Sequence, residues 1–310
     1  MYQTILVPFD GSPLSARALP IAAALAQATA ARLHVALVHD PSAFIPFIPG
    51  EVSIPVYDAE LESVNRREHQ EALDAAVAQL TATGVNAVGV LLEGTVIEAL
   101  LEHAKAAAVD LTVMSTHGRS GFARLRLGSV AAAYLTRATA PVYMVRGAGS
   151  EAVPEMPTGT LLCPIDGSAF SEAILPHAAR FAQVTGLSMA LLAVVVPHAV
   201  PMAPFGAAEI LADGSALAME EAGHLADLQR LVEQCPPGTT VHAVTDMSVS
   251  RRIIEEATRL NAGAIAMATH GRGGFKRLLL GSVADEVLRH THTPVLVYRP
   301  SPTSEPTDAA

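Results

Sequence analysis

The sequence predicts an α/β protein made of two tandem doubly wound domains, each with a five-stranded parallel sheet of Rossmann-like type. One observation is internal repetition, because "TILVPFDGSPLSARALPIAAALA" at 4–26 returns as "TLLCPIDGSAFSEAILPHAARFA" at 160–182. Similarly, "TAPVYMVR" at 139–146 returns as "HTPVLVYR" at 292–299. A second observation is that continuous apolar runs, typical of strands buried on both faces, alternate with helical patterns.

The elements of the first half follow from this alternation. Strands are expected at "TILVPF", "LHVALVH", "NAVGVLL", "LTVMST" and "PVYMV", and helices at about 13–29, 59–80, 96–107 and from near Gly128. Five strands in a doubly wound unit favour the order 3-2-1-4-5, although the sequence alone does not fix it. In that order the topological switch lies between the first and fourth strands, where ligands bind at the carboxyl ends.

The repeats also predict the domain boundaries. We expect a first domain over 1–147 and a second over 158–300, with the break inside "GAGSEAVPEMPTG". Residues 301–310 are rich in proline, serine and threonine, so we expect a disordered tail.

Composition excludes several classes of protein. The chain has 310 residues, of which 50% are hydrophobic, and a net charge of −10, which argues against nucleic-acid binding. Cys163 and Cys235 cannot make a disulfide framework and suggest buried free thiols in a reducing compartment. The N-terminus does not resemble a signal peptide, and no apolar run is long enough to cross a membrane. We therefore expect a soluble cytoplasmic protein that binds neither nucleic acid nor membrane.

A glycine- and arginine-rich stretch occurs in both halves. "STHGRSGFARLRLGSV" at 115–130 and "ATHGRGGFKRLLLGSV" at 268–283 are identical at twelve of sixteen positions, and each is basic without an acidic residue. Its glycines bring backbone N–H groups close to a ligand, and "GSV" opens a helix whose first N–H groups lack an intrahelical acceptor. This pattern predicts a phosphate site, in which Ser129 acts as helix N-cap or as phosphate donor.

Other interpretations of this stretch are weaker. A glycine turn with solvated arginines would explain one copy, but two copies make this less convincing. Neither a P-loop motif nor a G-x-G-x-x-G fingerprint is present, which disfavours ordinary P-loop hydrolysis and dinucleotide redox chemistry. His290 and His292 have no companion cysteine or carboxylate at metal-ligand spacing, so no metal site is expected.

The repeated motifs resemble those of the universal stress protein family, in its nucleotide-binding class. The family motif is G-x-x-G, nine residues, then G-[ST]. Here Gly118 is the second glycine and Gly128-Ser129 the closing pair, with Gly271 and Gly281-Ser282 in the second half. The first glycine is replaced by Ser115 and by Ala268. The resemblance covers nearly the whole chain twice and implies ATP or AMP at the switch point, Mg²⁺ with ATP, and a homodimer formed through the last strand.

The resemblance also implies which residues hold the nucleotide. Asp10 and Val38, with Asp166 and Val194, would lie at the nucleoside end. With the arginines and glycines of the repeated stretch, the expected nucleotide-binding residues are Asp10, Val38, Ser115, His117, Gly118, Arg119, Gly121, Gly128, Ser129 and Val130, and in the second half Asp166, Val194, Ala268, His270, Gly271, Arg272, Gly274, Gly281, Ser282 and Val283.

Some of these residues have alternative roles. Asp10 and Asp166 could instead cap the helix that follows "DGS", although we expect Ser12 and Ser168 to be the caps. His117 and His270 could merely brace the loop. The halves also differ, because His39 is replaced by Val195 and Gly94 by Met247.

Three functional classes remain. The first is an adenine-nucleotide-binding stress-response protein, a sensor or regulator with one site per repeat, whose bound state is read by protein partners not yet known. The second is a slow ATPase or phosphotransferase, which needs a positioned base such as Asp10, Asp166, His117 or His270. The third is a structural dimerisation module without ligand. The first is favoured, with no catalytic residue, and the apolar segments 41–60 and 197–210 could be flaps or partner surfaces.

Overall fold

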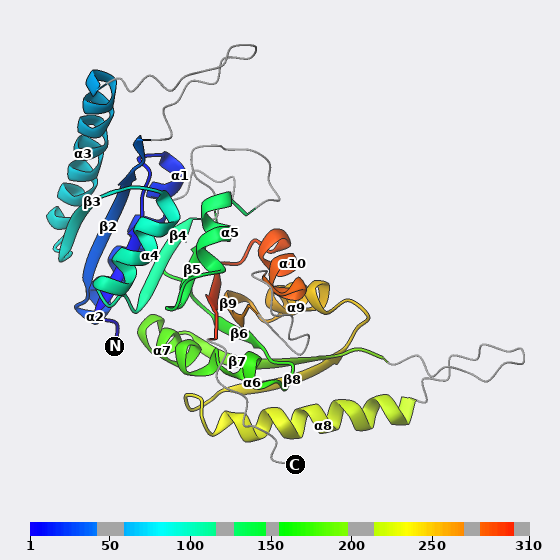
Figure 1. Cartoon of the computed structure of the whole chain (residues 1–310). Helices are drawn as coiled ribbons and strands as arrows, with labels where there is room; N and C mark the ends of the chain where they lie inside the picture. The colour runs from blue at the N-terminus through cyan, green and yellow to red at the C-terminus, as the bar shows by residue number, and fades with distance from the viewer. Residues whose placement is uncertain (42–58, 116–126, 147–154, 198–213, 270–279, 301–310) are drawn as a thin grey trace, which may run out of the picture. The chain divides into compact units, whose positions relative to one another are not determined.

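A computed structural model describes residues 1–41, 59–115, 127–146, 155–197, 214–269 and 280–300. The chain divides into two compact units, Met1–Met156 and Pro157–Ala310 (Figure 1). Each unit is an α/β domain and is described by itself below.

The first unit has a parallel sheet of five strands. Its elements are β1 (Thr4–Pro8), α1 (Pro13–Ala16), α2 (Ala18–Thr29), β2 (Arg32–His39), α3 (Ala59–Ala82), β3 (Ala87–Glu93), α4 (Val96–Ala106), β4 (Leu111–Ser115), α5 (Ser129–Leu135) and β5 (Val142–Val145). The strand order is β3-β2-β1-β4-β5, and neighbouring strands pair in parallel. The predicted order 3-2-1-4-5 is confirmed.

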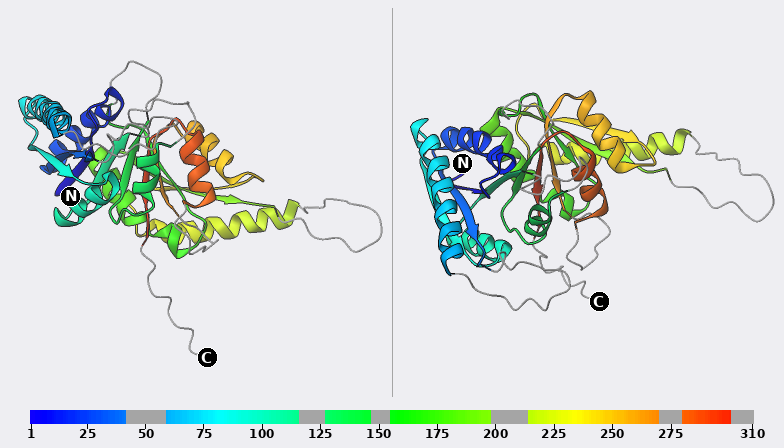
Figure 2. Two further views of the ribbon diagram at one scale, coloured as in Figure 1. Left: turned by 45° about the horizontal axis from the view of Figure 1, so that its top comes forward. Right: turned by 90° about the horizontal axis from the view of Figure 1, so that it is seen from above.

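The second unit repeats this architecture. Its elements are β6 (Thr160–Pro164), α6 (Ala169–Glu172), α7 (Leu175–Thr185), β7 (Ser188–Val195), α8 (Gly214–Val232), β8 (Thr240–Thr245), α9 (Val249–Arg259), β9 (Ala262–Ala268), α10 (Ser282–His290) and β10 (Val295–Tyr298). The strand order β8-β7-β6-β9-β10 is again 3-2-1-4-5. In each unit a long helix covers the outer strands, α3 over β2 and β3, and α8 over β7 and β8 (Figure 2).

Helices cover both faces of the sheet. The central strands are largely apolar, and residues such as Ile5 and Leu6 in β1 are fully buried. The two faces of β2 can be told apart by its histidines, because His34 contacts His103 of α4, whereas His39 contacts His69 of α3. Since successive side chains of a strand point to opposite faces, α3 and α4 lie on opposite sides of the sheet.

The single helix predicted for 13–29 is wrong, because the structure divides it into α1 and α2 at Arg17. Pro20 explains the break. Proline has no N–H to donate to the carbonyl four residues earlier, and its ring clashes with that carbonyl, here that of Ala16 at the end of α1. The second unit breaks in the same way, since Pro176 lies four residues after Glu172, the last residue of α6.

Helix α3 lies very close to the edge strand β3. A Cβ atom added to Gly89 would be 3.0 Å from Leu73 Cγ and 3.2 Å from Val77 Cγ2. The strand register places Gly89 beside Val35 in the first unit and Val241 beside Leu191 in the second. In each unit a proline ends the first strand and pairs with a residue of the second strand. Val35 and Leu191 are the residues directly before that paired residue, so they hold equivalent positions. The second unit therefore carries a valine where the first leaves little room for a side chain.

A histidine pair links β2 to α4 in the first unit. His34 Nδ1 lies 3.0 Å from His103 Nε2, so one ring donates and the other accepts. The pKa of His34 is lowered by burial first, then by His103 and Arg32, and the pKa of His103 is lowered by burial. Both rings are therefore held neutral to lower pH than in an unfolded chain.

This pair predicts an acid-sensitive first unit. Unfolded histidine takes up a proton near pH 6.5, whereas the folded pair resists it. The unfolded state then binds more protons, so the free energy of unfolding should decrease as the pH falls below about 6.5. Hydrogen exchange of peptides from β1 and β2, followed by mass spectrometry at pH 7.5 and 5.5, measures this decrease after correction for the intrinsic exchange rate.

A His34→Gln/His103→Gln variant is the matched control. Glutamine retains hydrogen bonding but does not titrate, so the decrease in the first unit should become smaller. The pKa values of His177 and His242 are also lowered by burial, but both lie in the second unit and are unchanged in the variant. An unaltered pH dependence would show that the pair does not carry the effect.

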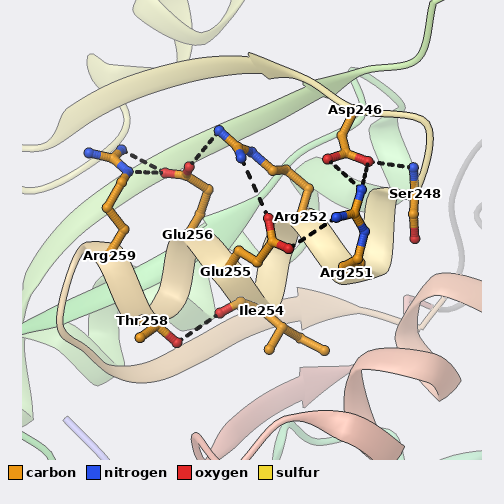
Figure 3. Close-up of polar contacts among 9 residues, drawn as sticks. All are labelled: Asp246, Ser248, Arg251, Arg252, Ile254, Glu255, Glu256, Thr258 and Arg259. Atoms are coloured by element: carbon orange, nitrogen blue, oxygen red, sulfur yellow. Dashed lines mark hydrogen bonds and ion pairs between the residues drawn. The ribbon is translucent and has the colours of Figure 1, made fainter.

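Ion pairs run along α9 in the second unit (Figure 3). The Glu256 side chain is only 2% exposed and bridges two arginines, with Oε1 3.0 Å from Arg252 Nη2 and Oε2 2.6 Å from Arg259 Nη2. At the start of the helix Arg251 donates to both carboxylate oxygens of Asp246, at 2.7 and 3.0 Å. The buried carboxylate of Glu256 is thus paired on both sides.

Candidate functional site

The "DGS" turns directly follow the first strand of each unit. Gly11 and Gly167 have φ values of 80° and 76°, which disfavour any residue with a Cβ. Ser12 Oγ accepts from the N–H of Ser15 at 3.1 Å, and Ser168 Oγ accepts from Ser171 N–H at 3.2 Å. The two serines therefore cap α1 and α6, as predicted.

The aspartates of these turns have a different local role. Asp10 Oδ1 accepts from the N–H of Ser12 at 2.9 Å, and Asp166 Oδ1 accepts from Ser168 N–H at 3.0 Å. This is an Asx turn, in which a carboxylate holds the backbone two residues further on. The aspartates thus shape the turn, and the capping role considered for them belongs to the serines.

Helices α5 and α10 begin directly after a glycine. Gly128 is the N-cap of α5 with φ −59° and ψ 150°, and Gly281 is the N-cap of α10 with φ −55° and ψ 145°. Ser129 is the first helical residue, so the N-cap role considered for it is wrong. The side chains of Ser129 and Ser282 are exposed at these helix starts. The first N–H groups of such a helix have no intrahelical acceptor.

The sheet brings the described candidates to one edge in each unit. In the first, Asp10 follows β1, Val38 is the penultimate residue of β2, and Ser115 ends β4, which pairs directly with β1. Gly128, Ser129 and Val130 form the start of α5, which leads away from that edge. In the second unit the same positions are held by Asp166, Val194, Ala268, Gly281, Ser282 and Val283.

The remaining candidates lie outside the described residues and stay predictions. They are His117, Gly118, Arg119, Gly121, His270, Gly271, Arg272 and Gly274. The same holds for 42–58 and 198–210, which make up most of the two apolar segments.

A buried histidine at this edge makes polar contacts with two side chains of α3. The sequence analysis did not predict this cluster. His39, the last residue of β2, is 1% exposed. Its Nε2 lies 3.1 Å from Glu62 Oε1, and its Nδ1 lies 3.2 Å from His69 Nδ1, both partners belonging to α3. The spacing of Glu62 and His69, two helical turns apart, was a signal that could have identified the cluster.

In the second unit a different hydrogen bond joins the long helix to the sheet. Val195 replaces His39, and Thr245 Oγ1 at the end of β8 donates to Glu221 of α8.

The turn after the third strand also differs between the two units. Gly94 N–H donates to His39 O at 3.2 Å and Asp246 N–H to Val195 O at 3.0 Å, so Asp246, rather than the predicted Met247, occupies the place of Gly94. Met247 is an additional turn residue and is 74% exposed.

The described residues contain neither a metal-binding group of side chains nor a membrane-spanning helix. Within those residues, no three histidine, cysteine or acidic side chains are grouped so that they could hold a metal ion. In the same part of the chain, no helix combines the length and the apolar character needed to cross a membrane.

Comparison with known proteins identifies the family. The sequence profile described as "Universal stress protein family" matches residues 1–146 and 158–299. A universal stress protein of Mycobacterium tuberculosis is 29% identical over 192 residues, which are 62% of each chain, so the alignment spans less than two thirds of that relative. The crystal structure of a universal stress protein from Archaeoglobus fulgidus matches with TM-score 0.67 and 20% identity, over 96% of this chain and 98% of the other. A universal stress protein solved in complex with cAMP is 27% identical, covering 47% of this chain and 99% of its own, with TM-score 0.36. The chain therefore belongs to the universal stress protein family, with one family domain in each half.

Proposed function

We propose that each half binds one adenine nucleotide, ATP or AMP, and that the protein is a sensor or regulator in a stress response. One observation carries the proposal. In both units an aspartate after the first strand and a Gly-Ser helix start after the fourth strand belong to the same edge of the sheet. This edge contains the switch point, where α/β domains of this type bind ligands.

The described residues would supply both ends of such a ligand site. The backbone N–H groups of Ser129 and Val130, and those of Ser282 and Val283, would donate to phosphate oxygens, assisted by the predicted loop glycines and arginines. Asp10 and Asp166 would accept from ribose hydroxyls. Asp10 and Asp166 would also be the carboxylates that could hold Mg²⁺ bound together with ATP, and the ion would neutralise phosphate charge.

Isothermal titration calorimetry on the full chain tests the proposal. We expect two equivalents of ATP or AMP per chain. Adenosine, which lacks phosphate, should bind more weakly than AMP if the helix starts hold the phosphate group. Saturation at one equivalent would disprove the equivalence of the halves, and no binding of either nucleotide would disprove the proposal.

Hydrolysis of the bound ATP is expected to be slow. Phosphoryl transfer needs an aligned nucleophile as well as stabilised charge. Among the described residues, the carboxylates nearest the switch point, Asp10 and Asp166, already hold the backbone of their own turns. We therefore expect phosphate release below about 1 s⁻¹, the low end of typical enzymes, in a single-turnover measurement with Mg²⁺.

An Asp10→Asn/Asp166→Asn variant makes this measurement decisive. Asparagine keeps an oxygen that can accept from the serine N–H, so the turns should persist. Turnover near 1 s⁻¹ that disappears in the variant would establish the alternative function, an ATPase or phosphotransferase with catalytic aspartates. The third alternative is a structural dimerisation module. It predicts that the purified protein, when denatured, releases no nucleotide that chromatography detects.

A further inference from the structure

Arg146 directly follows β5 in the first unit and is half-buried, with part of its charged group removed from solvent. Its Nε and Nη2 atoms are buried and have no hydrogen-bond partner among the described residues. Burial lowers the pKa of this guanidinium to about 10, so it still carries its charge at neutral pH. A buried charge without a partner is strongly unfavourable, and such groups normally pair with an opposite charge. The guanidinium therefore lacks an anion.

The strand register shows which face of the sheet this side chain belongs to. Thr112 of β4 faces α5, because its Oγ1 lies 3.0 Å from Tyr134 Oη. Thr112 pairs with Val142 and Met114 with Met144 on β5. Paired residues of neighbouring parallel strands point to the same face, and every second residue of a strand does so too. Arg146 is the next residue in this series and belongs to the α5 face.

The position along the strand places Arg146 at the candidate site. Val145 pairs with Ser115, the last residue of β4. Arg146 is one residue further, at the carboxyl edge that carries the residues expected to bind nucleotide. A planar guanidinium with two unused N–H directions suits a phosphate group, which accepts two parallel hydrogen bonds.

We propose that Arg146 binds a phosphate group at the carboxyl edge of the first unit's sheet. The source of that phosphate rests on the proposed function, which supplies it from the bound nucleotide, but free phosphate has the same chemistry. Arg146 then acts together with the start of α5, as a residue that distinguishes nucleotides from nucleosides.

Arg299 of the second unit provides a matched control. It follows Tyr298, which pairs with Ala268 and whose ring lies 4.0 Å, centroid to centroid, from that of His177 on α7. Since successive residues of a strand point to opposite faces, Arg299 points away from α7. Its nitrogens are not among the buried atoms without a partner in the described residues. Both arginines are half-buried, but only Arg146 has buried nitrogens that lack a partner among the described residues.

The first measurement uses ligand-free protein. Arg146→Gln removes an unpaired buried charge, so its melting temperature should equal or exceed that of the wild type. A clear decrease would show that Arg146 has a structural partner and would overturn the proposal. Adding inorganic phosphate should raise the melting temperature of the wild type more than that of Arg146→Gln.

The second measurement is calorimetry with ATP, adenosine and inorganic phosphate on the full chain. Arg146→Gln should weaken ATP at one of the two sites by at least about tenfold, about 1.4 kcal/mol, and leave adenosine unchanged. Arg299→Gln should change either affinity less than about threefold, because Arg299 has no buried nitrogen that lacks a partner. Equal ATP affinities in the wild type and Arg146→Gln would overturn the proposal while leaving the proposed function intact. If ATP fails to bind but inorganic phosphate binds the wild type and not Arg146→Gln, the proposed function fails and the anion site stands.

Discussion

Nucleotide binding in the first unit should be abolished when Gly128 is replaced by valine, and in the second unit when Gly281 is replaced. The branched side chain would occupy the space over the first N–H groups of α5 or α10, where phosphate oxygens must approach. Both glycines have negative φ values in the extended region, which valine also adopts, so each unit should still fold. We expect a loss of at least about 100-fold, about 2.7 kcal/mol, by calorimetry.

The single variants separate the two units. Gly128→Val should leave one equivalent of ATP bound, and so should Gly281→Val. Ser129→Ala is the mild control, because one neutral hydrogen bond contributes only about 0.5–1.5 kcal/mol. Undiminished binding in the Gly128→Val/Gly281→Val protein, with melting temperatures near the wild type, would place the nucleotide elsewhere.

Glu256→Ala should be the most destabilising single change among the ion pairs of α9. It removes a buried carboxylate that accepts from two guanidinium groups and leaves a cavity in its place. The arginines are partly exposed and can turn to solvent, which limits the effect to about 2–3 kcal/mol in the free energy of unfolding. Cys163 reports on the second unit alone, because its thiol is fully buried in β6 and reacts only after unfolding.

Thiol labelling at increasing urea concentration, resolved by mass spectrometry, measures this change. Glu255→Ala is the matched control on the same helix. The Glu255 side chain is 45% exposed where it pairs with Arg251 and Arg252, so the expected cost is about 0.5 kcal/mol. Equal effects of the two substitutions would contradict a special role of the buried carboxylate.

The doubly wound fold was predictable because two independent patterns agreed. The apolar runs of β1 and β6 indicate strands buried on both faces, and the internal repeat indicates the same fold for both halves. The strand order was only favoured by this fold class, and the structure fixes it. The break between α1 and α2 was missed because Pro20 was placed inside one long helix. Its effect depends on the carbonyl four residues earlier, a backbone contact that hydrophobic periodicity does not reveal.

The site was predictable where a residue's chemistry follows from its local sequence. Ser12 and Ser168 were expected as caps because a serine before a helix has few other uses. Glu256 and Arg146 were not expected, because the burial of their polar atoms depends on packing in the folded chain. In "RRIIEEATR" the two glutamates are indistinguishable, and only packing of α9 against β7, β9 and α10 makes one of them buried. The order of residues in the chain does not contain that difference.

The close seating of α3 on Gly89 limits how these two domains can exchange parts. If a crossover between the repeats joined α3 to β8, Leu73 and Val77 would have to shift to make room for the side chain of Val241. The reverse chimera, α8 over β3, would place a glycine where α8 now faces a valine. Recombination between the duplicated halves should therefore yield the more stable chimeras when the long helix and its edge strand are inherited together. The two copies still share a fold, but they are no longer interchangeable.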